Sequence, residues 1–256
     1  MSLDITRAPT IGVPHGFFGR AGGRSTGAVA GLNCGFGAED DPETVRANRR
    51  LAADAIIEGA PLASVHQVHG ADAVVADTAW PIDQRPHADA LATATPGLVL
   101  GIVTADCAPI LLADEEAGVI AAAHAGWRGA VGGVTDAAIG AMLSLGAKVE
   151  RISAAVGPCL AQRNFEVGYD FPDAILAEDP DNERFFIEGP SGQPQFDLEA
   201  YVAARLAAAG IGRVWTAGLD TYALSERYYS YRRATHEGAP TYGRQVSMIG
   251  LPGQPR

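Results

Sequence analysis

The stretch GLVLGIVTADCAPILLAD, residues 97–114, places a single cysteine between two apolar runs. Each run is as long as a strand, and a continuous apolar run of that length is typical of a strand buried on both faces of a sheet. A third run, GVIAAAHAG at residues 118–126, follows a short charged turn. We therefore predict three consecutive buried strands, with Cys107 where the first gives way to the second.

Helical patterns flank these strands. In DDPETVRANRRLAADA, residues 40–55, Asp41 is suited to cap a helix and Pro42 to occupy its first position. Mixed strands and helices indicate an α/β or α+β fold, and the absence of an internal repeat or convincing linker favours one domain over residues 1–256. Further helices are predicted over 129–146 and 196–210, and further strands over 63–70, 72–77, 152–158, 214–218 and 244–251.

The charge balance limits the classes of partner. The 30 Asp and Glu residues outnumber the 19 Lys and Arg residues, and the formal net charge is −11. This argues against binding to nucleic acid or to an anionic membrane, because both attract basic protein surfaces. A small anion needs only a local group of arginines.

Cysteine usage and hydropathy bear on the compartment. The three cysteines stand in unrelated contexts and do not suggest a disulfide framework. No basic-then-apolar signal opens the chain, and no uncharged apolar stretch reaches the roughly 18 residues needed to span a bilayer. We expect a cytoplasmic protein without a membrane partner, and its oligomeric state stays open.

Three residues are candidate metal ligands. His69, Cys107 and His124 each stand at the edge of an apolar run, next to small residues that allow close backbone approach. Their separations are too long for a zinc finger and suit a site that the fold assembles. Three protein ligands would leave a fourth tetrahedral position open, as in catalytic zinc. The alternative is that the cysteine and the histidines are ordinary buried or surface residues.

Several motifs, in the same order along the chain, carry a resemblance to a known family: HGFFGRAGGRSTG, DDPETVRANRR, SVHQVHG, VTADCAPILL, AAAHAGWRG, VGPCLAQRNFEVG and YYSYRRATHEGAPTYGRQVSMI. The chain resembles the bacterial laccase-domain family, also called multicopper polyphenol oxidoreductase, whose members are now described as purine nucleoside phosphorylases that also deaminate adenosine. The resemblance implies a layered α/β/β/α sandwich with mixed sheets. It also implies His69, Cys107 and His124 as the metal ligands.

The histidine count distinguishes between the two activities. A multicopper oxidase needs about ten histidine ligands, usually in His-x-His pairs, whereas this chain has six histidines and no such pair. A single copper is retained as an alternative occupant, because two imidazoles and a thiolate are also the blue-copper ligands. The usual axial methionine would have to be Met1, Met142 or Met248, and none lies in a motif near the ligands. Zinc with an open position fits nucleoside chemistry better.

We therefore predict a zinc-dependent purine nucleoside phosphorylase acting on adenosine, inosine, guanosine or methylthioadenosine, with adenosine deamination as a second activity. The usual zinc-deaminase signature, His-x-Glu followed by Pro-Cys-x-x-Cys, is absent, so that activity would use a different site. The alternatives are a copper-dependent polyphenol oxidase and a non-catalytic metal-binding redox partner protein.

Charged and aromatic residues in the matched motifs are candidates for substrate contact. Arginine suits phosphate through its planar fork of donors, although a surface salt bridge is the ordinary alternative for any one of them. Cys159 is either a catalytic nucleophile, which would be an alternative to chemistry at the metal site, or a structural thiol. Cys34 is predicted to be structural. The predicted catalytic residues are Asp106, Arg128 and His66, and the predicted substrate or phosphate contacts are Arg20, Arg49, Trp127 and Arg232, with Arg128 also considered for the anion.

Overall fold

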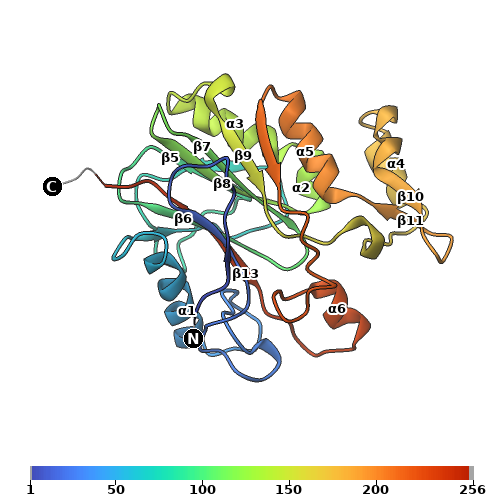
Figure 1. Ribbon diagram of the computed structural model, residues 1–256, viewed down its shortest axis with the longest axis horizontal. Coiled ribbons are helices and arrows are strands. Elements are labelled where there is room, and N and C mark those ends of the chain that lie inside the picture. Colours follow the sequence, from blue (N-terminus) through green and yellow to red (C-terminus); the bar gives the residue numbers. More distant parts are fainter. Residues whose placement is uncertain (1, 254–256) are drawn as a thin grey trace.

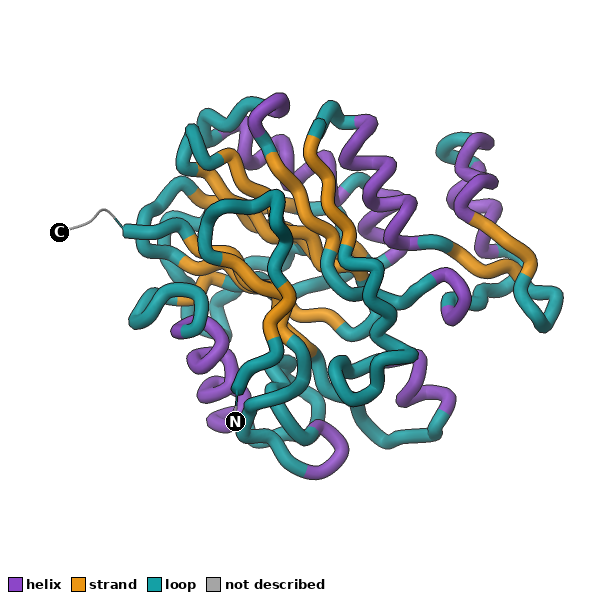
Figure 2. The backbone as a smooth tube through the Cα atoms, in the orientation of Figure 1, coloured by secondary structure: helices purple, strands orange, loops and turns teal. Residues whose placement is uncertain are grey.

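The computed structural model describes residues 2–253, so Met1 and residues 254–256 of the predicted domain lie outside the described part. Two β-sheets pack face to face, and helices cover their outer faces (Figures 1 and 2). The layered α/β/β/α sandwich implied by the family resemblance is thus confirmed. No helix in residues 2–253 is both long and apolar enough to cross a membrane.

The larger sheet contains the two strands around which the site is built. Its central pair, β7 and β8, is antiparallel and buried along its whole length, as the apolar runs predict. Parallel pairs at both edges make the sheet mixed. Its strands, in spatial order, are β12 (Arg213–Thr216), β9 (Ser153–Val156), β7 (Ala108–Asp114), β8 (Val119–Ala125), β5 (Ala90–Thr93) and β4 (Ala73–Val75).

The smaller sheet is also mixed, because its last pair is parallel while the others are antiparallel. The chain passes from this sheet to the larger one at Cys107, between the strands β6 and β7. Its strands, in spatial order, are β1 (Ile5–Thr6), β2 (His15–Phe18), β13 (Gln245–Gly250), β6 (Val99–Thr104) and β3 (Leu62–Ala63).

The core has three apolar layers. Leu100 and Ile102 of β6 meet Leu111 of β7 and Ile120 of β8 between the sheets. The outer face of the larger sheet is covered by α3 (Val134–Ser144) and α5 (Leu198–Ala208), and that of the smaller sheet by α1 (Pro42–Asp54). Figure 1 shows these helices on opposite sides of the sandwich.

The helix boundaries follow local sequence signals. Asp41 caps α1, since its carboxylate accepts a hydrogen bond from the Thr44 amide, and Pro42 is the first helical residue. The helix predicted over 129–146 is instead two helices, α2 (Trp127–Gly132) and α3. They are separated by Gly133, whose φ of 93° is a left-handed conformation that glycine adopts without a steric penalty.

A small lobe projects from one end of the sandwich (Figure 1). It contains α4 (Phe171–Leu176) and the hairpin of β10 (Phe186–Glu188) and β11 (Pro194–Phe196). The helix α6 (Tyr231–His236) contacts the turn between β6 and β7, where the Arg232 amide donates to Asp106. Short 3-10 turns occur at Gly27–Val29, Val149–Arg151, Gln162–Asn164 and Pro180–Phe185.

Candidate metal centre and adjoining cavities

The three predicted metal ligands meet in space. The ligand atoms of His69, Cys107 and His124 all lie within 4.8 Å of one another. Cys107 immediately precedes β7, and the pairing of Pro109 with His124 brings the thiol beside that histidine at one end of the sheet. The rings of His69 and His124 are nearly perpendicular, with centroids 4.8 Å apart.

Asp89, a buried residue that was not predicted to belong to the site, positions two of the ligands, His69 and His124. Asp89 accepts backbone hydrogen bonds from Val68, His69 and Gly70, and it accepts one from Nδ1 of His124 at 2.7 Å. The other nitrogen of His124, Nε2, is thereby directed to the site. Burial raises the pKa of Asp89, but these hydrogen bonds outweigh burial and lower it below the usual value.

The same carboxylate explains why the strand predicted over 63–70 is mostly a loop. Three successive amides turn toward Asp89 instead of pairing with a neighbouring strand, and His69 adopts a left-handed φ of 60°. The sequence does contain a signal for Asp89, because it is the one charged residue in the stretch 88–93. A buried carboxylate without a hydrogen-bonding partner is energetically unfavourable, so its presence there indicates a partner.

The donor set and the available space fit a metal ion. A Cβ atom added at Gly126 would lie 3.1 Å from Cδ2 of His69, 3.3 Å from Sγ of Cys107 and 3.9 Å from Cε1 of His124. Glycine thus leaves open a space that all three ligands border. Two imidazoles and a thiolate are ligands that zinc and copper both accept.

Cys107 and His124 are matched electrostatically. Burial raises the pKa of Cys107, but attraction to His124 and hydrogen bonds from both histidines outweigh burial and lower it to about 6. Burial lowers the pKa of His124, but Cys107 and Asp89 together raise it to about 9. The site therefore favours the thiolate, which is the form that binds metals.

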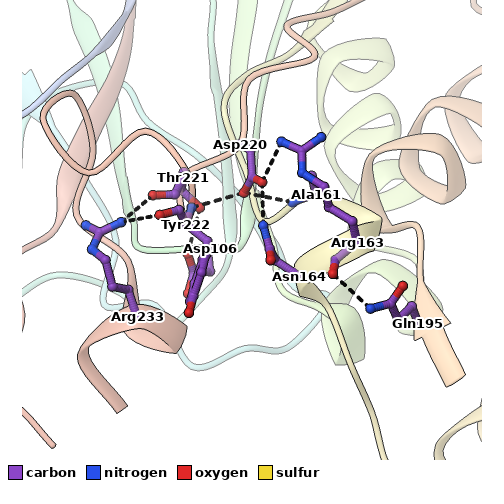
Figure 3. Close-up of polar contacts among 9 residues, drawn as sticks. All are labelled: Asp106, Ala161, Arg163, Asn164, Gln195, Asp220, Thr221, Tyr222 and Arg233. Carbon is purple, nitrogen blue, oxygen red and sulfur yellow. Dashed lines mark hydrogen bonds and ion pairs between the residues drawn. The ribbon is translucent and has the colours of Figure 1, made fainter. Parts of the chain in front are cut away.

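Asp106 ties the Cys107 turn to a distant segment of the chain (Figure 3). Its buried carboxylate accepts hydrogen bonds from the hydroxyls of Thr221 and Ser230, at 2.6 and 3.0 Å, and from the Arg232 amide at 2.6 Å. Burial raises its pKa despite these bonds, and its φ is 82°. With both oxygens engaged, Asp106 is better suited to positioning Cys107 than to transferring a proton.

A second buried acid, Asp220, fixes the neighbouring loop (Figure 3). It was not among the predicted site residues. Its carboxylate connects the segment around Thr221, which contacts Asp106, to the loop over residues 161–164. That loop leads to Phe165, which lines a cavity beside the metal ligands. The groups that donate to it are the amides of Ala161 and Tyr222 and the side chains of Arg163 and Asn164, at 2.7–3.3 Å.

A large cavity of about 580 Å³ opens on one side of the three ligands. Arg49, which was predicted to bind phosphate, lines it together with Arg85 and Arg244, which were not predicted. His66 lies at its exposed side and stacks on His87, with centroids 4.6 Å apart. The sequence missed the two additional arginines because nothing local to Arg85, or to Arg244 at the start of the strand predicted over 244–251, indicates that their side chains reach this cavity.

A smaller cavity of about 270 Å³ shares His69 and Cys107 with the large one. Its lining is mostly apolar and aromatic, and it includes four of the residues predicted for catalysis or substrate contact, Asp106, Trp127, Arg128 and Arg232. The Arg128 guanidinium lies 4.5 Å from the Trp127 ring centroid. Arg232 donates hydrogen bonds to the carbonyls of Asn164 and Glu166. The remaining lining residues are Ala105, Gly126, Leu160, Phe165, Leu198 and Tyr231.

Other candidates lie apart from both cavities or are buried. Arg20 lines neither cavity; its guanidinium donates to the carbonyls of Ala30 and Ser225 and stacks on Tyr229. Burial raises the pKa of Cys34 to about 12, and it raises that of Cys159 well above its usual value. Both thiols suit the structural alternative.

The methionines considered for copper do not approach the ligands. Met142 packs in the core beneath α3, and Met248 packs in the core beneath α1. Neither lines a cavity with the three ligands, and Met1 lies outside the described residues.

Comparison with known proteins agrees with this architecture. Residues 14–252 match the family model described as multi-copper polyphenol oxidoreductase laccase. A purine nucleoside phosphorylase of Deinococcus radiodurans is 43% identical over 98% of this chain and 94% of its own, and one of Streptomyces coelicolor is 40% identical over 90% and 94%. The crystal structure of Neisseria meningitidis protein NMB0706 superposes with a TM-score of 0.86 at 34% identity, covering 98% of this chain and 99% of that one. The chain therefore belongs to the multi-copper polyphenol oxidoreductase laccase family, as its motifs indicated.

Proposed function

We propose that this protein is a zinc-dependent purine nucleoside phosphorylase, with adenosine deamination as a second activity. The observation that carries the proposal is the position of the His69, Cys107 and His124 group between a larger, more polar cavity lined by three arginines and a smaller, mostly apolar cavity lined by Trp127 and Phe165. A nucleoside and phosphate present the complementary chemistry. The names of the relatives from Deinococcus and Streptomyces support the same reading.

Zinc is the proposed metal because three protein ligands leave one position open. When bound there, the ion would supply a Lewis-acidic site next to both cavities. Asp89 would keep His124 oriented through Nδ1, and Gly126 would keep the space open. These two residues act through the ligands, so we regard them as positioning residues.

In phosphorolysis, a phosphate oxygen bonds to C1′ of the ribose while the bond from C1′ to N9 breaks, and the electron pair leaves on the purine. Arg49 in the large cavity is placed to bind phosphate. Trp127 and Phe165 offer aromatic faces for the purine in the small cavity. Arg128 beside Trp127 is placed to stabilise negative charge on the departing base.

His66 and Arg232 complete the proposed site. The exposed imidazole of His66 is proposed to exchange a proton with the phosphate at the large cavity. Arg232 is proposed to shape the small cavity through its hydrogen bonds to the carbonyls of Asn164 and Glu166.

Product analysis tests the proposal. The protein should contain about one zinc per chain, and Cys107→Ala should lose it. Inosine and phosphate should give hypoxanthine and ribose 1-phosphate, and adenosine without phosphate should give inosine and ammonia. If metal-loaded protein releases no purine base from adenosine, inosine, guanosine or methylthioadenosine, the phosphorylase proposal is wrong. Failure to release ammonia alone would remove only the deaminase activity.

A copper-dependent polyphenol oxidase is the second candidate. The family description and the histidine–cysteine–histidine ligand set favour it. Stoichiometric copper with intense blue absorbance and phenol-dependent oxygen consumption would establish it in place of the phosphorylase. Metal binding with neither activity would favour the redox partner alternative.

A further inference from the structure

We propose that the large cavity contains a dedicated orthophosphate subsite, formed by the guanidinium groups of Arg49, Arg85 and Arg244 and the hydroxyl of Thr104. This inference rests on the proposed function and adds to it the place where the attacking phosphate binds. Only Arg49 among these four residues was suggested by the sequence.

The three arginines come from separate parts of the chain and meet around Phe36. The guanidinium carbons of Arg49 and Arg85 lie 5.6 and 5.8 Å from the centroid of Phe36. A guanidinium nitrogen of Arg244 lies 3.5 Å from the carbonyl oxygen of the same residue. Phe36 and the three arginines all line the large cavity.

These positive charges have no acidic partner in the described structure. Within residues 2–253, no carboxylate oxygen lies within 4.0 Å of the guanidinium of Arg49, Arg85 or Arg244. Arg49 is only 6% exposed, and burial, together with repulsion from Arg85, lowers its pKa to about 10. The chain has a net charge of −11, yet these positive charges have no carboxylate partner. An anionic ligand would supply the missing negative charge and stabilise the cluster.

Arg49 and Arg85 are each held in place and keep a donor for a ligand. Arg49 donates to the Cys34 carbonyl and to the Ser64 hydroxyl, and Arg85 donates to the carbonyls of Ile82 and Val65. These bonds engage two nitrogens of each guanidinium and leave the third nitrogen without a protein partner. A charged N–H donor that is held in this way suits an oxygen of phosphate.

Thr104 provides an independent indication of a ligand. It is 2% exposed, it lines the same cavity, and its Oγ1 has no hydrogen-bond partner. Strand alternation along β6 places it on the side of Leu100 and Ile102, at the end of the space between the sheets. A buried hydroxyl without a partner is unfavourable, and a phosphate oxygen would accept its hydrogen bond.

The position of the subsite fits the reaction. The large cavity reaches His69 and Cys107, which also line the small cavity. A phosphate on the arginines would thus approach the ribose from one side of the metal centre, while the purine occupies the aromatic cavity on the other side. This arrangement keeps the attacking and leaving groups apart, as displacement at C1′ requires.

The test is a titration of metal-loaded protein with inorganic phosphate, in the absence of nucleoside, by calorimetry. Arg244→Gln should weaken phosphate binding about tenfold or more, since it removes a charged donor. Thr104→Val keeps the side-chain shape and should weaken binding about threefold without lowering the melting temperature. Arg244→Lys, which keeps the charge, should recover part of the affinity.

Arg46→Gln is the matched control. Arg46 lies 5.9 Å from the same Phe36 ring, but it pairs with Glu43 and does not line the large cavity. It should bind phosphate as the unchanged protein does. Zinc content and melting temperature are measured for every variant, so that a lost metal or a lost fold is recognised.

The possible results separate this inference from the proposed function. If the unchanged protein binds no phosphate, or if Arg244→Gln and Thr104→Val bind it normally, the subsite is wrong even where nucleosides are cleaved. If both variants bind weakly while the protein cleaves no nucleoside, the subsite stands and the phosphorylase proposal falls.

Discussion

The substitution Asp89→Asn probes how the fold holds the metal ligands. One carboxylate oxygen accepts from the His69 amide and from Nδ1 of His124, and the other accepts from the amides of Val68 and Gly70. An asparagine has a single oxygen, so two of these donors would face an NH₂ group. Leaving buried donors unpaired costs about 1–3 kcal/mol each, and loss of an outer partner of a metal ligand typically weakens metal binding about 10- to 100-fold.

We expect Asp89→Asn to lower the free energy of unfolding by about 2–6 kcal/mol and the zinc affinity by about 10- to 100-fold. Denaturant unfolding and competition with a chromophoric chelator measure the two effects. Asp72→Asn is the control, because Asp72 stands in an identical Ala-Asp-Ala triplet but is exposed. Zinc affinity unchanged in Asp89→Asn, or equally reduced in Asp72→Asn, would refute the positioning role.

Three further substitutions test the site. Gly126→Ala should reduce zinc affinity about tenfold, because the added methyl would lie 3.1 Å from His69 and 3.3 Å from Cys107; full metal content in the purified variant would contradict this. Trp127→Ala should raise the KM for the nucleoside about 2- to 10-fold, through lost stacking, and leave the KM for phosphate unchanged; the opposite pattern would place the purine elsewhere. Arg128→Ala should lower kcat about tenfold or more with little change in melting temperature, and an unchanged kcat would remove Arg128 from the proposed chemistry.

The sequence predicted the elements whose signals are local. The apolar runs around Cys107 correspond to β6, β7 and β8, and the run that follows Cys107 within the stretch 97–114 coincides with β7. The cap at Asp41 was also confirmed. These features depend on residues within a few positions of one another, so one segment contains the whole signal.

The parts that the sequence did not reveal depend on contacts between distant segments. The role of Asp89 appears only when β5 lies beside β8 and the loop at His69 folds onto it. Arg85 and Arg244 are 159 positions apart and become neighbours only in the cavity. Arg20, whose motif suggested a substrate contact, donates to backbone carbonyls and lines neither cavity, and its predicted role stays a prediction.

X-ray absorption at the zinc edge of the purified protein tests the central claim most directly. We predict about one zinc per chain, with two imidazole nitrogens at about 2.0 Å, one sulfur at about 2.3 Å and one further light-atom ligand in the open position. The sulfur contribution should disappear in Cys107→Ala. A coordination shell without sulfur, or full zinc retention in that variant, would contradict the account.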